Sequence, residues 1–237
     1  MNDDDRKALD NLNASPINPL PGAVWLLLAV VLGIEAVLWA GGAGLVGGAR
    51  AVGWRITAIE SYAYSSAIQH WMIENMRFPL WNLARYGAFS FVHGSPMHAL
   101  FGAVLLAALG KSVAEQFGAL RFLLLVLLVP ILAAAGFGLI VGNHPLGWLL
   151  GAMPMVFGLV GAFTWLKWRE AGADAVKKRR AFGMIALLLG ARLAFGLIAE
   201  AGPGWIAEAL AFALGFALSA LFLGPQSWSR TRNRLRG

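Results

Sequence analysis

The chain has no cysteine and few charged residues. None of its 237 residues is Cys, and Asp, Glu, Lys and Arg together make up only 13% of the sequence. Without thiols the chain cannot form disulfides, thiolate metal sites or a cysteine nucleophile. The charged fraction is about half of the ~25% that is usual in soluble domains, which argues against a soluble globular protein.

Long apolar stretches dominate instead. Hydrophobic residues make up 59% of the sequence, and its mean hydropathy is +0.67. A helix needs about 20 apolar residues to cross a hydrocarbon core roughly 30 Å thick. Six stretches are about long enough: Ala23–Val46, Tyr86–Leu109, Leu120–Val141, Leu146–Leu166, Phe182–Ala199 and Trp205–Leu223. We therefore predict an all-α, polytopic membrane protein with six transmembrane helices.

The two ends of the chain are polar. The first 20 residues are acidic and lack the basic start and short apolar run of a signal peptide, so we expect the first span to be retained. Prolines at 16, 19 and 21 oppose helix formation and predict a first helix that begins near Gly22. The predicted organisation is a cytoplasmic tail (1–21), a transmembrane domain (22–224) with a long outer loop (47–85), and a basic cytoplasmic tail (225–237). Aromatic residues in the outer loop indicate a segment that lies at the membrane surface.

The basic residues predict the orientation of the spans. With the N-terminus inside, fourteen Lys and Arg residues lie in cytoplasmic segments, while the outer loop holds four, namely Arg50, Arg55, Arg77 and Arg85. Basic residues are retained on the cytoplasmic side, so both termini are expected there, in a bacterial inner membrane. The net charge of +7 thus follows membrane topology, and no nucleic-acid partner is expected because no soluble module interleaves aromatic and basic residues.

The basic C-terminal tail suggests a lipid contact. It contains Arg230, Arg232, Arg234 and Arg236 and no acidic residue. Anionic headgroups attract such a segment by about 1 kcal/mol per residue. The same arginines also serve as a topology anchor.

Small residues recur along two of the predicted spans. The sixth span carries Ala207, Ala211, Gly215 and Ser219 at intervals of four, and the fourth carries Gly158, Gly161 and Ala162. Small residues let helix backbones approach closely in lipid. They predict packing within the bundle, and a surface for partner helices would use the same residues.

Three charged residues fall inside predicted spans: Glu35, Arg192 and Glu208. An unpaired charge at the membrane midplane costs at least roughly 2.5 to 3.5 kcal/mol on insertion scales. We therefore expect Arg192 to pair with Glu35, Glu208 or both. Pairing with a charge on another subunit is the alternative.

The segment from Arg85 to His98, RYGAFSFVHGSPMH, is the most specific motif in the chain. Arg85 leads into the second span, and His93 is followed by His98 five residues later. Together with six spans and a long first outer loop, this segment resembles the rhomboid intramembrane proteases. The segments GAMPMVFGLVGAF from Gly151 and AFALGF from Ala211 resemble the family's glycine-any-serine-glycine and alanine-histidine segments. The resemblance covers most of the chain.

This resemblance implies a site that has lost its catalytic groups. The family performs acyl transfer with a serine and a histidine, but Met153 stands at the nucleophile position and Phe212 at the base position. Pro154, after the nucleophile position, lacks an N–H that could donate to an oxyanion. Gly102 replaces the family's asparagine, so only His98 of that group is retained.

Two hypotheses would give the chain a reactive site despite these losses. Ser90 and Ser95 lie near His93 and His98 in sequence and could form an unorthodox catalytic pair. Ser95 before Pro96 is, however, also typical of a helix N-cap, with the two histidines bonding to backbone or loop groups. A metal site made only of His70, His93, His98 and His144 lacks an accompanying carboxylate at ligand spacing, so we expect no metal and no cofactor.

The resemblance implies a function as well as a fold. Inactive rhomboid relatives bind other membrane proteins, so we predict a non-catalytic pseudoprotease that acts in assembly, quality control or protection. An accessory subunit of an inner-membrane complex is a second hypothesis. An intramembrane serine protease with non-standard residues is a third, and transport is a fourth.

Overall fold

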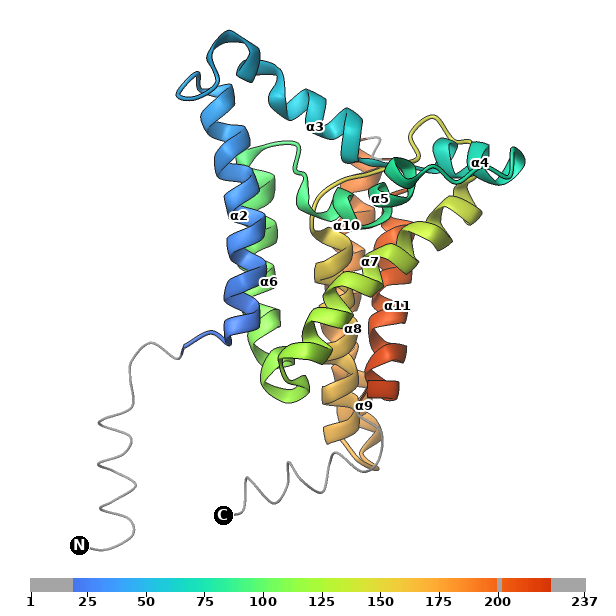
Figure 1. Ribbon diagram of the computed structural model, residues 1–237. Coiled ribbons are helices and arrows are strands. Elements are labelled where there is room, and N and C mark those ends of the chain that lie inside the picture. The colour runs from blue at the N-terminus through green and yellow to red at the C-terminus, as the bar shows by residue number, and fades with distance from the viewer. Residues whose placement is uncertain (1–18, 200–201, 223–237) are drawn as a thin grey trace, which may run out of the picture.

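The protein is almost entirely helical. A computed structural model describes residues 19–199 and 202–222. Its elements are α2 (Gly22–Gly42), η1 (Gly48–Gly53), α3 (Trp54–Tyr62), β1 (Tyr64–Ser65), α4 (Ser66–Glu74), α5 (Leu80–Ala88), η2 (Phe89–Phe91), α6 (Pro96–Phe117), α7 (Ala119–Val141), β2 (Trp148–Leu149), α8 (Met153–Glu170), α9 (Ala175–Ala181), α10 (Gly183–Ala199) and α11 (Trp205–Phe222). The longer helices form a bundle, and α3, α4 and α5 lie across one end of it (Figure 1).

The bundle has the dimensions of a membrane domain. Within the described part of the chain, α2, α6, α7 and α11 are long and apolar enough to cross a membrane. Two further long helices are not in this group: α8 has 18 residues, as α11 does, but ends in charged side chains, and α10 has 17 residues. The chain is therefore an all-α, polytopic membrane protein. In Figure 1, α2 begins and α11 ends at the end of the bundle opposite α3.

The predicted second span, Tyr86–Leu109, was placed wrongly along the chain. Helix α6 begins at Pro96, because Ser95 caps it by accepting the His98 backbone N–H at 3.2 Å. The helix then continues past Lys111, whose Nζ lies 4.0 Å from a Glu115 carboxylate oxygen one turn later. It stops at Gly118, which has a φ of 77°. The Ser95–Pro96 cap therefore marks the start of this helix, whereas the apolar residues between Tyr86 and Ser95 lie outside it.

The predicted fourth span, Leu146–Leu166, also starts too early. Residues Trp148–Leu149 are extended and pair antiparallel with Tyr64–Ser65, which follow α3 in the outer loop. Helix α8 begins only after Gly151, where φ is +87°. The apolar side chains before α8 thus belong to a loop that contacts the chain between α2 and α6, residues 43–95, which is called here the outer segment.

Helices α8 and α11 approach each other backbone to backbone. A Cβ atom at Gly161 would overlap the Phe212 carbonyl oxygen, and one at Gly215 would overlap the Gly158 carbonyl oxygen. Gly158 also faces α7, where a Cβ atom would lie 2.7 Å from Val129 Cγ1. Ser219 is buried and donates its hydroxyl to the Gly215 carbonyl at 2.6 Å. The small residues of the fourth and sixth spans therefore meet within the bundle.

Adding one methyl group at this crossing should separate the two helices. We expect Gly161→Ala to lower stability by about 1–3 kcal/mol, the usual cost of overpacking, because the obstructing atom is backbone. Gly33→Ala is the matched control, since nothing lies within 4 Å of a Cβ atom there. Unfolding of both variants in mild detergent measures the difference, and equal stability of the two would show that the close approach is not required.

Candidate functional site

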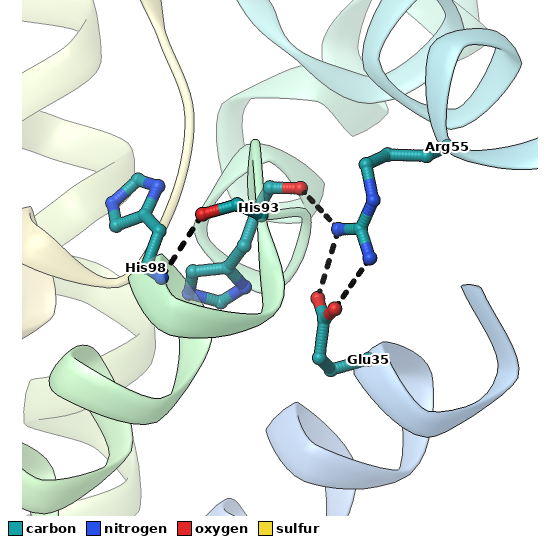
Figure 2. Close-up of polar contacts among 5 residues, drawn as sticks. Glu35, Arg55, His93 and His98 are labelled. Atoms are coloured by element: carbon teal, nitrogen blue, oxygen red, sulfur yellow. Dashed lines mark hydrogen bonds and ion pairs between the residues drawn. The ribbon is translucent and has the colours of Figure 1, made fainter. Parts of the chain in front are cut away.

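Both histidines of the family motif pack against the turn that precedes α8. His93 lies in the loop before α6, is fully buried, and its Nε2 accepts the Ala152 N–H at 3.2 Å. His98 lies in the first turn of α6, and a Cβ atom at Gly151 would come within 2.6 Å of its Cε1. The two imidazole rings meet edge to face with centroids 5.2 Å apart (Figure 2). The Gly151–Ala152 turn is thereby held directly ahead of Met153.

A cavity of about 290 Å³ opens beside this turn. It is lined by His98, Trp148, Leu149, Leu150, Met153, Pro154, Arg192, Gly204 and Glu208. Met153 therefore lies at a hollow next to His98, as its position in the family motif implies. No lining side chain carries a hydroxyl, thiol or amine. Among the described residues, the polar side-chain groups that line this cavity are one imidazole, one guanidinium, one carboxylate and the indole N–H of Trp148, set among apolar side chains.

The charged wall of the cavity is an ion pair between α10 and α11. The Nε of Arg192 lies 3.1 Å from both carboxylate oxygens of Glu208. Glu208 is only 4% exposed, so the guanidinium compensates a carboxylate that water does not reach freely. One of the two carboxylates expected to pair with Arg192 therefore does so.

The other candidate partner of Arg192, Glu35, pairs with Arg55 instead. Arg55, at the start of α3, places Nη1 3.0 Å from Glu35 Oε2 and Nη2 2.5 Å from Glu35 Oε1. Its Nη1 also donates to the His93 carbonyl oxygen at 2.8 Å (Figure 2). Glu35 is seven residues, or about 10 Å, from the C-terminal end of α2, within reach of a long side chain from α3.

This set of contacts, called here the Glu35–Arg55–His93 link, joins three separate elements. Glu35 belongs to α2, Arg55 to α3, and His93 to the loop that holds the turn before Met153. The link therefore connects the outer segment to the wall of the cavity. The sequence predicted Arg55 only as a loop residue, because nothing local indicates that its side chain enters the bundle.

Arg85 stabilises the outer segment and does not line the cavity. From α5 it donates to the Ala63 and Glu60 carbonyl oxygens, each at 2.8 Å, at the end of α3. These carbonyls lack partners within the helix because they lie in its last turn. The motif arginine thus fixes the helix that also carries Arg55.

The altered family positions do not all gather at the cavity. Met153 and Pro154 line it, and Gly102 faces the same turn, where a Cβ atom would lie 3.3 Å from Ala152 Cβ. Phe212 is not a lining residue, and its ring instead lies 6.4 Å from the Phe182 ring between centroids. An apolar ring gains more from burial against other aromatic rings than from facing an ion pair.

Ser95 acts as the helix cap, and its hydroxyl accepts a backbone N–H instead of contacting an imidazole. Ser90 is fully buried, so it is not exposed to a substrate. Of the four histidines named for a metal site, His93 and His98 contact each other, whereas His70 and His144 have other partners: His70 Nε2 lies 3.1 Å from Glu74, and His144 Nδ1 accepts the Leu146 N–H. Among residues 19–199 and 202–222, no group of three or more His, Asp or Glu side chains could hold a metal ion.

A buried glutamine was missed by the sequence reasoning. Gln69 lies on α4, and its Oε1 accepts hydrogen bonds from the hydroxyl groups of Tyr64 and Tyr86 at 2.6 and 2.7 Å. Its Nε2 donates to the Ala135 carbonyl oxygen at 3.0 Å. Burial raises the pKa of Tyr64, which keeps its hydroxyl protonated as a donor. A single glutamine among aromatic residues gives no sequence signal for such a contact. The network fastens the outer segment to α7.

Breaking the Glu35–Arg55–His93 link should destabilise the protein. Arg55→Gln leaves the Glu35 carboxylate, 7% exposed, without its charge partner, so we expect a loss of about 3 kcal/mol. Adding Glu35→Gln should recover part of this loss, because it removes the unpaired charge. Arg50→Gln, at an exposed outer-loop position, is the control. A double-mutant cycle of unfolding free energies measures the coupling, and additive effects would contradict the link.

Protonation of His93 should weaken the fold in acid. Burial, assisted by the neighbouring His98, lowers the pKa of His93 from 6.5 to about 4. His93 therefore binds a proton more readily in the unfolded chain than in the folded one. Its contribution to the free energy of unfolding is fully present above pH 6.5 and is lost as the pH drops towards 4. Melting temperatures of the wild type and His93→Gln across this range test it. The difference between the two should shrink at low pH; parallel curves would contradict the assignment.

Comparison with known proteins identifies the family. Residues 80–225, more than half of the chain, match the Rhomboid domain. The match runs from the start of α5 past the end of α11 and includes the histidine loop, Met153 and the ion pair. A search of curated proteins finds no match. The chain belongs to the rhomboid family.

Proposed function

We propose that this rhomboid-family protein is non-catalytic and binds other integral membrane proteins. The observation that carries the proposal is the composition of the cavity beside His98. Met153 lies where the family's nucleophile would stand, and a thioether has no proton to lose and cannot form an acyl-enzyme. The carboxylate of Glu208 is engaged by Arg192. The cavity therefore suits binding better than hydrolysis.

We further propose six spans with both termini in the cytoplasm of a bacterial cell. The alternation of α2, α6, α7, α8, α10 and α11 between the two ends of the bundle supports this number (Figure 1). Helix α9, which carries basic residues, lies at the end of the bundle where α2 begins (Figure 1), in agreement with the positive-inside rule. The four C-terminal arginines, proposed to contact anionic lipids, lie outside the described residues.

The bound partner is proposed to be a membrane-embedded segment. Trp148, Leu149, Leu150 and Met153 give the cavity an apolar wall that suits side chains from a transmembrane helix. The ion pair adds a polar contact that a partner with a charged or amide side chain would use. A client-binding factor and a subunit of an inner-membrane complex both fit this cavity.

An activity assay tests the loss of catalysis. The purified full-length chain is incubated with a transmembrane substrate and with a fluorophosphonate probe, beside an active rhomboid protease. We expect neither cleavage nor labelling of this chain. Labelling or cleavage that Ser95→Ala abolishes would overturn the proposal and support a protease with non-standard residues.

A separate cross-linking experiment tests partner binding. A photo-crosslinking residue is placed at Met153 in the cavity or at Leu221, which is 75% exposed, as the control. We expect cross-links to membrane proteins to be enriched at position 153. Many partners at low occupancy would indicate client binding, and one partner at a fixed ratio would indicate a subunit. Equal cross-linking at both positions would argue against the cavity as the binding site.

A further inference from the structure

A second cavity lies at the opposite end of α8 from Met153. It has a volume of about 370 Å³ and is lined by Lys167, Glu170, Ala171, Lys177, Arg180 and Ala181. Lys167 and Glu170 come from the end of α8, Ala171 directly follows it, and the others come from α9. Three cations and one acid therefore surround a hollow of a size that holds a small ligand.

The fold of α9 directs two of these cations into the cavity. Asp174 caps the helix, since its Oδ1 accepts the Val176 and Lys177 N–H groups at 2.9 and 3.1 Å. Lys177 and Arg180 are three residues apart and share one helix face. Lys178 points elsewhere, with its Nζ 4.7 Å from the centre of the Trp168 ring.

The charges of the cavity are only partly neutralised. Lys167 pairs with Glu170 at 2.8 Å, and Lys177 lies 3.6 Å from Asp174. Arg180 has no hydrogen-bond or ion-pair partner among the residues that the structure describes. A guanidinium with unused donors beside ammonium groups suits a phosphate, because it can offer two parallel N–H groups to phosphate oxygens.

Aromatic residues place the cavity at the depth of lipid headgroups. Trp165 and Trp168 lie on the last turns of α8; Trp168 is 37% exposed, whereas Trp165 is buried in the core and contacts a cation. The Arg169 guanidinium lies 5.0 Å from the centre of the Trp165 ring. Tryptophans with adjacent cations are typical of the interface between membrane and water. A phosphate in this cavity would therefore be at the level of phospholipid headgroups.

We propose that the cavity between the end of α8 and α9 binds the phosphate of an anionic phospholipid headgroup. Arg180 supplies paired donors, Lys167 and Lys177 supply charge, and Glu170 competes with the ligand for Lys167. This site is separate from the cavity beside His98. It does not depend on whether the protein cleaves or binds other proteins.

Lipid binding by matched variants tests the site. The full-length protein in mild detergent is titrated with phosphatidylglycerol and examined by native mass spectrometry, with phosphatidylcholine as the neutral lipid. We expect Arg180→Gln to bind phosphatidylglycerol about fivefold more weakly, a factor that corresponds to ~1 kcal/mol per cation. Arg179→Gln removes the same charge one residue away, outside the cavity, and should bind like the wild type.

The opposite change should strengthen binding. Glu170→Gln removes the acid and releases Lys167, so we expect affinity to rise by about fivefold. All substituted residues are exposed, and unfolding temperatures verify that the variants fold. Equal losses for Arg179→Gln and Arg180→Gln, equal binding of phosphatidylcholine, or no gain for Glu170→Gln would overturn the site. Displacement of the lipid by equimolar inorganic phosphate would overturn the lipid assignment in favour of soluble phosphate.

Discussion

The outer segment is attached to the apolar bundle where a buried charge of the bundle requires a partner. In hydrocarbon an unpaired charge or backbone group has no water to bond, so each must find a partner in the chain. Glu35 finds Arg55, and the same guanidinium reaches the His93 carbonyl oxygen. Because His93 in turn holds the turn before Met153 through the Ala152 N–H, one buried carboxylate indirectly positions the cavity wall. The contacts that join α2 to the cavity wall therefore result from the pairing of this one buried charge.

Features that depend on local sequence could be predicted. The prolines before Gly22 oppose helix, and α2 begins there. Ser95 before Pro96 indicated a cap, and the hydroxyl accepts the expected backbone N–H. Gly161 and Gly215 were expected to allow close packing, and both face backbone carbonyls across the α8–α11 crossing. Each of these outcomes is decided by steric size or hydrogen bonding within a few residues, which a sequence shows directly.

Features that depend on contacts distant in sequence could not be predicted. Apolar residues before α8 suggested more helix, but Trp148–Leu149 pair with the outer loop about eighty residues earlier. Glu35 and Arg192 had complementary charges, yet Arg55 lies nearer in the fold. Phe212 matched a family position, but its ring lies against Phe182 instead of lining the cavity. Complementary charge and apolar character leave several partners possible, and only the three-dimensional arrangement selects one.

The motif histidines illustrate why a catalytic pattern is weak evidence of catalysis. His93 accepts a backbone N–H with its Nε2, which a buried amide group needs whether or not a nucleophile follows. His98 packs edge to face on His93 and against Gly151, where a side chain larger than hydrogen would collide with it. Both rings therefore contribute to the same turn as packing and hydrogen-bonding groups. A rhomboid-family chain that binds without cleaving would still require them, because the cavity beside Met153 keeps its shape through that turn.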